Sequence, residues 1–523
     1  MQVSLKGMTP VLSAWKHFGD KLDLGGAPAR RWFRAAMWPV VAVLSLLKFF
    51  YLAADFPNYS PWMIDQAKFT DEGWWANAAV MHALTGNWYV AGDYNPAVAL
   101  PVWPALLSVV FHFTGVSLLA ARALNVTVSI ATLAIVYALV CRYSKSELPA
   151  QVAVLLLAAS PFAFAFNRLA ILDTLVVFEF CLLMLAASFA SAKRLWPLVA
   201  LAVLIPIMIL TKTTAALLAP AVFWLAWAAT GYKLGGLLRA ALAVAVVPAA
   251  LLKGYTALVS ALGYGADYNY FFKVNAMSEI DWHQTLPTLS DLFQNCFWID
   301  RALYPMALVI LVLTLAWKRK LWSNPLFAAS WIALAAQAAF IFRRQDDFAP
   351  RYFLVMLAPM VWVVTLTFAE LMVHAKKTAI ALMAAMAASA VANVIMIGQF
   401  LTHRDYDLQD AANGIRSIIR SHPEQRPLLF GVSGAQISLM TGIPSINDGF
   451  STEDTAPKLE SYQPGWYLTW YSISPEDESF LSPYRLEKMA SYPAFDDDER
   501  NPLILYKMVR KAGNSFVLPT GPR

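Results

Sequence analysis

The chain has 523 residues, of which 59% are hydrophobic and 14% are charged, against about 45–50% and about 25% in ordinary soluble domains. This balance, with a mean hydropathy of +0.52, excludes a soluble globular protein and an intrinsically disordered one. Three cysteines are too few for a disulfide scaffold. The sequence predicts a polytopic α-helical membrane protein, whose net charge of +6 is first a topology signal, and we expect no nucleic-acid partner.

The basic segment 1–36 is expected to lie in the cytoplasm and to be followed by a membrane domain at 37–400. In this domain about eleven apolar stretches are long enough to cross roughly 30 Å of hydrocarbon. These candidate spans are residues 37–54, 118–141, 149–166, 174–192, 195–211, 213–229, 240–259, 302–317, 326–342, 352–371 and 378–400.

A further apolar run, 97–114, is shorter and is interrupted by prolines. If it does not cross, basic pairs such as Lys193 with Arg194 and Lys376 with Lys377 all fall on one side, in agreement with the positive-inside rule. We therefore expect interfacial helices in a first outer loop at 55–117, with the later outer loops on the same side.

Residues 401–523 also follow on the outer side and are polar enough for a folded α/β domain. Alternating apolar residues predict strands at 427–432, 465–471 and 502–508, and a helical period predicts a helix at 410–421.

Two acids, Asp71 and Glu72, begin an expected helix in the first outer loop that stops at Gly86. Acids at this position favour the positive end of the helix dipole, so a capping role and a chemical role are equal alternatives. A second short outer loop places Arg168 and Asp173 at the same surface. Ionisable groups at the mouth of a helix bundle are functional candidates by default.

The order of these motifs resembles the GT-C glycosyltransferases, in particular the protein O-mannosyltransferases and the lipid A aminoarabinose transferase. The resemblance extends over residues 40–370 and rests on short motifs. They are Asp71-Glu72, the apolar segment 97–114, Ala120-Ala121-Arg122-Ala123-Leu124, Asn167-Arg168-Leu169-Ala170-Ile171-Leu172-Asp173, and Arg351-Tyr352-Phe353-Leu354 with Pro359.

The resemblance implies an enzyme that takes a sugar from a polyprenyl phosphate carrier at the outer face of the membrane. Asp71 matches the family's catalytic acid, Glu72 the acid beside it, and Asp173 the acid of the second outer loop. It also implies a bacterial inner membrane, with the active site and the C-terminal domain in the periplasm; a location in the endoplasmic reticulum has the same topology.

The chemistry of such a transfer needs the same residue types. A carboxylate must accept the proton of the attacking hydroxyl, and we choose Asp71 as this general base. Preorganised cations must face the departing phosphate. The candidates are Arg168, Arg351, Arg122 and Lys212. A single displacement inverts the anomeric centre; the alternative is a retaining reaction in which Asp71 and Asp173 act as a carboxyl pair.

The sequence departs from the aminoarabinose branch at one position. That branch has a lysine before the prolines of the apolar segment, whereas this chain has Tyr94-Asn95-Pro96. Tyr94 and Asn95 are candidates for contact with the acceptor, as are Tyr268 and His283 in the aromatic loop 264–300, and Arg344 in a charged turn. Most aromatic residues of that loop are expected to anchor the fold in membrane lipid.

Several questions stay open at this level. No cofactor is certain, and Asp71 with Asp173 is the expected ligand pair if a Mg²⁺ or Mn²⁺ ion takes part. The acceptor hydroxyl belongs to a lipid, a polysaccharide or a protein. The alternative functions are a transporter or flippase of a lipid-linked sugar, for which no internal repeat is evident, and a non-catalytic scaffold.

Overall fold

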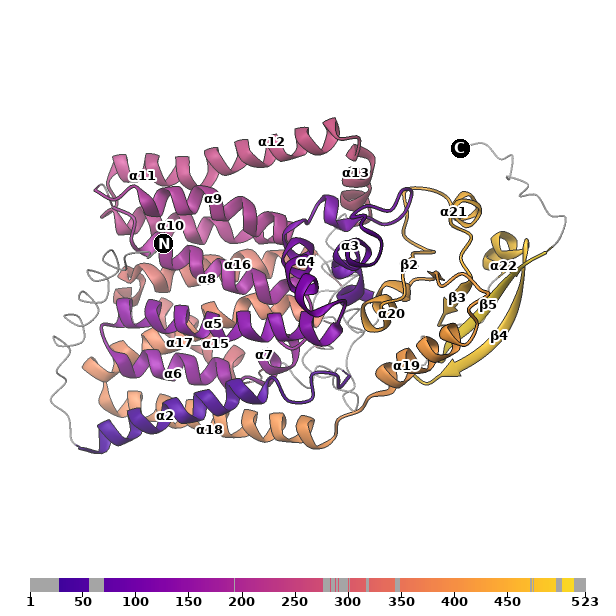
Figure 1. Cartoon of the computed structure of the whole chain (residues 1–523). Coiled ribbons are helices and arrows are strands. Elements are labelled where there is room, and N and C mark those ends of the chain that lie inside the picture. Colours follow the sequence, from indigo (N-terminus) through magenta and orange to yellow (C-terminus); the bar gives the residue numbers. More distant parts are fainter. Residues whose placement is uncertain are drawn as a thin grey trace, which may run out of the picture.

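The computed structural model describes most of the chain, in separate ranges. These are residues 28–55, 70–191, 193–275, 300, 302–316, 319–343, 349–470, 473, 475–494 and 501–511, with the isolated residues 283, 287 and 290. They form a bundle of long helices with a sheet-containing region beyond one end (Figure 1). Between the two lie α3 (Glu72–Thr85), α4 (Val102–Thr114) and α13 (Gly265–Val274), and we call this the capped end of the bundle.

The bundle contains the remaining helices up to residue 402. They are α2 (Pro28–Leu47), α5 (Leu118–Ser144), α6 (Glu147–Ala158), α7 (Pro161–Phe166), α8 (Leu172–Ser188), α9 (Trp196–Thr211), α10 (Ala219–Ala229), α11 (Leu234–Ala241), α12 (Val247–Ala261), α15 (Leu303–Ala316), α16 (Pro325–Arg343), α17 (Leu354–His374) and α18 (Lys376–Thr402). Short helical turns add η3 (Pro96–Val98), η4 (Thr213–Leu218), η5 (Leu242–Val246), η6 (Arg319–Ser323) and η8 (Pro350–Phe353).

Five helical runs among the described residues are long and apolar enough to cross a membrane: Leu118–Ser144, Leu234–Ala261, Pro325–Arg343, Pro350–His374 and Lys376–Arg420. Shorter apolar helices of 10–17 residues pack beside them. The middle of the bundle is α17, in which every residue from Leu354 to Phe368 is buried. A helix that is apolar on all sides must be surrounded by other helices, and α17 contacts α5, α6, α8, α15, α16 and α18.

One expected span is not continuous. The apolar run 149–166 forms two helices, because α6 ends at Ala158 and α7 begins at Pro161. Proline has no N–H group and disfavours the helical conformation in the residue before it. Ser160 is accordingly extended, and its hydroxyl caps α7 by accepting a hydrogen bond from Ala163 N at 3.2 Å.

The interrupted run 97–114 forms the turn η3 and the helix α4, which lies against α3. With 13 residues, α4 is about 20 Å long at 1.5 Å per residue. It is therefore shorter than the hydrocarbon core of a bilayer, and its interfacial position stays a prediction.

The C-terminal region after α18 is an α/β unit. Its sheet has the order β2-β1-β3-β5-β4, with β1 parallel to β2 and β3, and β5 antiparallel to β3 and β4. The elements are α19 (Asp407–Arg420), β1 (Leu429–Phe430), α20 (Gly434–Thr441), β2 (Ser445–Ile446), α21 (Thr455–Tyr462), β3 (Trp466–Thr469), α22 (Pro475–Leu481), β4 (Tyr484–Tyr492) and β5 (Leu503–Arg510). The expected strands contain β1 and β3 and overlap β5, and the expected helix overlaps α19.

The C-terminal region shares a hydrophobic core with the capped end. Buried residues of α3 and α4, such as Val80 and Trp103, belong to the same cluster as Ile415 of α19 and Trp466 of β3. The closest approach is between α3 and α20, where Gly73 lies directly against the backbone of Ala435 and Gln436. Only a residue without a Cβ atom fits at this position.

We predict that Gly73→Ala loosens this junction. The added methyl group would collide with the backbone of Ala435 and Gln436, and overpacking of this kind costs about 1–3 kcal/mol of unfolding free energy. Thermal unfolding of the detergent-solubilised protein measures the effect. Gly235→Ala on α11 is the matched control, because a methyl group there has no atom within 4 Å. Equal melting temperatures for the two variants would contradict the tight packing described.

Candidate active site

The carboxylate of Asp71 lies at the beginning of α3 and forms an ion pair with Arg351. Asp71 is the N-cap residue of α3, where the helix dipole favours a negative charge. Arg351 lies in η8, the turn that leads into α17. Its Nη2 atom is 2.6 Å from Asp71 Oδ2, and the two side chains are 8% and 3% exposed. The first outer loop and the central helix of the bundle are thus joined by one nearly buried ion pair.

A second ion pair joins Asp173 and Lys212. Asp173 lies in the first turn of α8, and Lys212 is the residue with extended backbone between α9 and η4. Lys212 Nζ donates to Asp173 Oδ1 at 2.7 Å. Tyr352 lies close to both cations, because its ring centroid is 4.9 Å from Lys212 Nζ and 5.5 Å from Arg351 Cζ.

Both ion pairs line one cavity of about 600 Å³ at the capped end of the bundle. Its walls come from α3, the loop before η3, α8, η4, α13, α16, η8 and the C-terminal region. The remaining lining residues are mostly aromatic, aliphatic or hydroxyl-bearing: Trp74, Trp75, Tyr94, Leu100, Leu172, Thr213, Thr214, Ala216, Leu217, Phe271, Phe272, Val274, Asn275, Phe340, Tyr352 and Phe450. Two carboxylates and two cations therefore face a largely apolar cavity.

Glu72 has a different environment from Asp71, although the two are adjacent. Its side chain is fully buried and lies outside the cavity lining. It receives two hydrogen bonds from Arg122, at 2.8 Å from Nε and 2.7 Å from Nη2. Ala170 N donates at 2.7 Å, and Gln436 Nε2 of α20 donates at 3.3 Å. Glu72 thus fixes the beginning of α3 to α5, to the loop before α8 and to the C-terminal region.

Arg122 and Arg168 also lie outside the cavity lining. Arg122 Nη1 donates to the carbonyls of Leu52 and Ala54, at 2.6 and 3.0 Å. Arg168 Nη2 donates to the carbonyls of Phe50 and Tyr51, at 2.8 and 2.6 Å. Both guanidinium groups hold the segment that follows α2, so the structure does not bring them together with Arg351 and Lys212.

Of the remaining candidates from the sequence that the structure describes, only Tyr94 lines the cavity. The Asn95 amide donates to the carbonyls of Val90 and Asp93 and to Asp267 Oδ1. Tyr268 accepts a hydrogen bond from Thr256 at 3.3 Å and is absent from the lining. His283 is exposed, and Arg344 lies outside the described residues.

Several residues at the site were not expected from the sequence, among them Tyr352, Gln436 and Phe450. Tyr352 could have been predicted, because it follows Arg351 directly in the Arg-Tyr motif. No sequence pattern pointed to Gln436 or Phe450, because they lie in the C-terminal region and reach the site only through packing. Gln436 Oε1 accepts a hydrogen bond from Gly73 N at 2.8 Å, and Phe450 lines the cavity.

Asp71 and Asp173 are the residues that would hold a Mg²⁺ or Mn²⁺ ion. Carboxylate oxygens suit both ions, but each of these groups is already ion-paired, with Arg351 and with Lys212. Among the described residues no group of three or more His, Cys, Asp or Glu side chains is arranged to bind a metal ion.

The chain was compared with known proteins. Residues 96–252 match the family model described as dolichyl-phosphate-mannose-protein mannosyltransferase, and no curated sequence matches. Two crystal structures of ArnT from Cupriavidus metallidurans are similar over 91% of this chain. The apo form has 14% identity, a TM-score of 0.60 and 98% coverage of its own chain. The form bound to undecaprenyl phosphate has 13% identity, a TM-score of 0.59 and 97% coverage.

A more distant similarity is to the oligosaccharyltransferase of Archaeoglobus fulgidus, solved in complex with Zn and sulfate. It has 11% identity and a TM-score of 0.50, and the match covers 90% of this chain and 73% of that one. All these proteins share the GT-C fold, which is therefore the fold of this chain.

We predict that Glu72→Gln destabilises the protein. The substitution keeps the size of the side chain but leaves the buried Arg122 guanidinium without a carboxylate. Breaking a buried ion pair in this way costs about 3–5 kcal/mol, which a lowered melting temperature of the solubilised protein reports. Asp410→Asn on the exposed face of α19 is the control. If Glu72→Gln melts at the wild-type temperature, Arg122 does not depend on this carboxylate.

Proposed function

We propose that this chain, a glycosyltransferase of the GT-C superfamily, moves a sugar from a polyprenyl phosphate to a hydroxyl acceptor, with Asp71 as general base. The observation that carries the proposal is the cavity in which Asp71, Asp173, Arg351 and Lys212 meet. It combines a carboxylate for the attacking hydroxyl with cations for a phosphate. The family match of residues 96–252 supports the same class of donor.

The reaction is a single displacement. The acceptor oxygen forms a bond to the anomeric carbon while the bond from that carbon to the phosphate oxygen breaks. The hydroxyl proton passes to Asp71, and the polyprenyl phosphate leaves with the bonding electrons. Because the leaving group is a stable anion, the step needs no enzyme nucleophile and inverts the anomeric centre.

Arg351 and Lys212 are the proposed contacts of the donor phosphate. A guanidinium group has five N–H donors, so Arg351 can bind Asp71 and a phosphate oxygen together. Lys212 is 17% exposed and faces the same cavity. ArnT in complex with undecaprenyl phosphate has the same fold, which supports a lipid tail between the helices and a phosphate at their ends. Asp173 then orients Lys212, and Glu72, Arg122 and Arg168 are positioning residues.

The chain is an integral membrane protein, and we place the capped end on the periplasmic side of a bacterial inner membrane. The basic residues Arg142 and Lys145 at the end of α5, Lys233 before α11, and Lys376 and Lys377 at the beginning of α18 support this orientation. They lie at the ends of helices away from the capped end, and cytoplasmic loops carry the excess of Lys and Arg.

The first prediction from the proposed function concerns Asp71→Asn. Radiolabelled polyprenyl phosphate sugars are offered to the purified protein, and release of polyprenyl phosphate is measured. Removing the general base is expected to lower the rate by about 10²–10⁴-fold while the protein stays folded, and the product formed by wild type has the anomeric configuration opposite to the donor. Wild-type release by Asp71→Asn refutes the assignment of the base. A product with retained configuration supports the carboxyl-pair alternative.

The second prediction concerns Lys212→Met. Loss of a charged hydrogen bond to the phosphate is expected to weaken binding of undecaprenyl phosphate by about 10- to 100-fold, measured by binding of the radiolabelled lipid. Lys320→Met is the matched control, because Lys320 is 71% exposed and pairs with Glu370 outside the cavity. Unchanged lipid binding in a folded Lys212→Met protein would exclude Lys212 from the phosphate site.

A further inference from the structure

One wall of the cavity is built by the C-terminal region. The Phe450 ring centroid lies 5.0 Å from that of Trp74 and 5.9 Å from that of Tyr94, and the Trp74 and Tyr94 rings are 5.5 Å apart. All three rings line the cavity. We call Trp74, Tyr94 and Phe450 the aromatic wall. It combines side chains from α3, from the loop before η3 and from the loop after β2.

The position of Phe450 is fixed by Asn447. The side-chain oxygen of Asn447 accepts hydrogen bonds from Gly449 N at 3.0 Å and from Phe450 N at 2.8 Å. These bonds close a tight turn that directs the chain toward the cavity. The next residue is also held, because Ser451 N donates to the Tyr270 hydroxyl of α13 at 3.1 Å. Phe450 is therefore not at a free loop tip.

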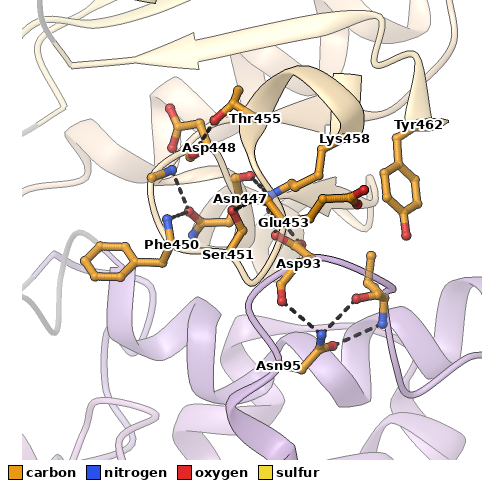
Figure 2. A network of polar contacts seen from close by, with 12 residues as sticks. Asp93, Asn95, Asn447, Asp448, Phe450, Ser451, Glu453, Thr455, Lys458 and Tyr462 are labelled. Carbon is orange, nitrogen blue, oxygen red and sulfur yellow. Dashed lines mark hydrogen bonds and ion pairs between the residues drawn. The ribbon is translucent and has the colours of Figure 1, made fainter. Parts of the chain in front are cut away.

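The turn is joined to the first outer loop by a buried ion pair (Figure 2). Lys458 Nζ of α21 lies 2.8 Å from Asp93 Oδ1, and the two side chains are 0% and 1% exposed. Asn447 N donates to both Asp93 oxygens at 3.1 and 3.2 Å, and Lys458 also donates to the Asn447 carbonyl. Burial raises the pKa of Asp93, while Lys458 and the backbone donors oppose this shift.

Asp93 is next to Tyr94 in the chain, so the ion pair positions two members of the aromatic wall. Further contacts close the same junction: Glu453 N donates to the Gly92 carbonyl at 3.1 Å, and the Tyr462 hydroxyl donates to the Ala91 carbonyl at 2.8 Å. A buried ion pair contributes little net stability, but removing one partner leaves an uncompensated charge. Its presence here fixes one arrangement of the two loops.

The aromatic wall lies on the side of the cavity away from the helices of the bundle. Lys212, Thr213, Phe340 and Arg351 belong to bundle helices or their ends. This is the side from which the proposed lipid-linked donor would enter. The aromatic wall belongs to the capped end and the C-terminal region. An acceptor that does not come from the membrane is therefore expected on the side of the aromatic wall.

We propose that the aromatic wall is the acceptor subsite, that it takes a saccharide ring carrying the attacking hydroxyl, and that Asp93 and Lys458 are positioning residues for it. The inference rests on the proposed glycosyltransferase function. It adds the acceptor class and the residues that select it.

The chemistry of the wall favours a saccharide over a peptide. An aromatic face packs against the apolar C–H face of a sugar ring, and hydroxyl groups at the rim of the ring stay free to face Asp71. A bound peptide brings an N–H and a C=O group with every residue, and each needs a partner when buried. The wall residues offer few such partners, since the Trp74 indole N–H already donates to the Val432 carbonyl at 3.2 Å.

The test uses the full chain in lipid nanodiscs with a polyprenyl phosphate sugar that the wild-type protein cleaves. Two acceptor probes are compared, a series of alkyl glycosides and a series of Ser- and Thr-containing peptides. Phe450→Ala is expected to raise the KM for the alkyl glycoside by about three- to tenfold, with a smaller change in kcat, and Phe450→Tyr to stay near wild type. Phe480→Ala is the matched control, because Phe480 contacts Phe430 outside the cavity.

Lys458→Met tests the positioning role. It leaves Asp93 buried without its cation, and we expect the KM for the alkyl glycoside to rise as in Phe450→Ala. The double variant Asp93→Asn with Lys458→Met removes both charges and is expected to restore part of the affinity. If the single variant does not fold, the double variant and Phe450→Ala still decide the question.

Three results would overturn the inference. They are an unchanged glycoside KM in Phe450→Ala, an equal rise of that KM in Phe480→Ala, and transfer to peptides but to no glycoside. Failure of the proposed function is a separate outcome, because it appears as the absence of Asp71-dependent release of polyprenyl phosphate with every acceptor, including water.

Discussion

The geometry of the site depends on the hydrogen bonds that the buried carboxylate of Glu72 accepts. This carboxylate gathers Arg122 of α5, the backbone of Ala170 before α8 and Gln436 of α20 around the beginning of α3. Asp71 is the preceding residue, so its carboxylate can reach Arg351 only while α3 begins at this point. An ionised side chain that is shielded from water needs several hydrogen-bond donors. Because the donors to Glu72 come from other segments, they and α3, four segments in all, are held in one arrangement.

The adjacent residues Asp71 and Glu72 place their charges in different surroundings. Successive residues of a helix point about 100° apart, which turns Glu72 into the protein and Asp71 toward the cavity. The pair of Glu72 with Arg122 is sealed from solvent, whereas the pairs at Asp71 and Asp173 border a cavity that a substrate can enter. In the proposed function, the charges that face the cavity exchange partners with a phosphate, whereas Glu72 and Arg122 stay paired.

The C-terminal region is part of the site and does not form a separate appendage. Gln436 contacts the beginning of α3, and Phe450 completes the cavity wall. The family match ends at residue 252, so these contributions lie outside the part of the chain that it covers. A mostly apolar core shared with α3 and α4 explains why the region stays in place.

The sequence by itself determined the helical membrane fold and three of the five C-terminal strands. It also pointed to Asp71 and Asp173, the two acids that line the cavity. These follow from local composition and from ionisable residues at helix starts. The sequence did not reveal β4, an exposed edge strand in which Arg485, Glu487 and Lys488 interrupt the apolar pattern, or the break before Pro161. Only the tertiary structure decided that Glu72, Arg122 and Arg168 are bonded outside the cavity, while Lys212 and Phe450 line it. The reason is physical: a charge is marked by its residue type, but its partner and its access to the cavity are set by the packing of segments far apart in the chain.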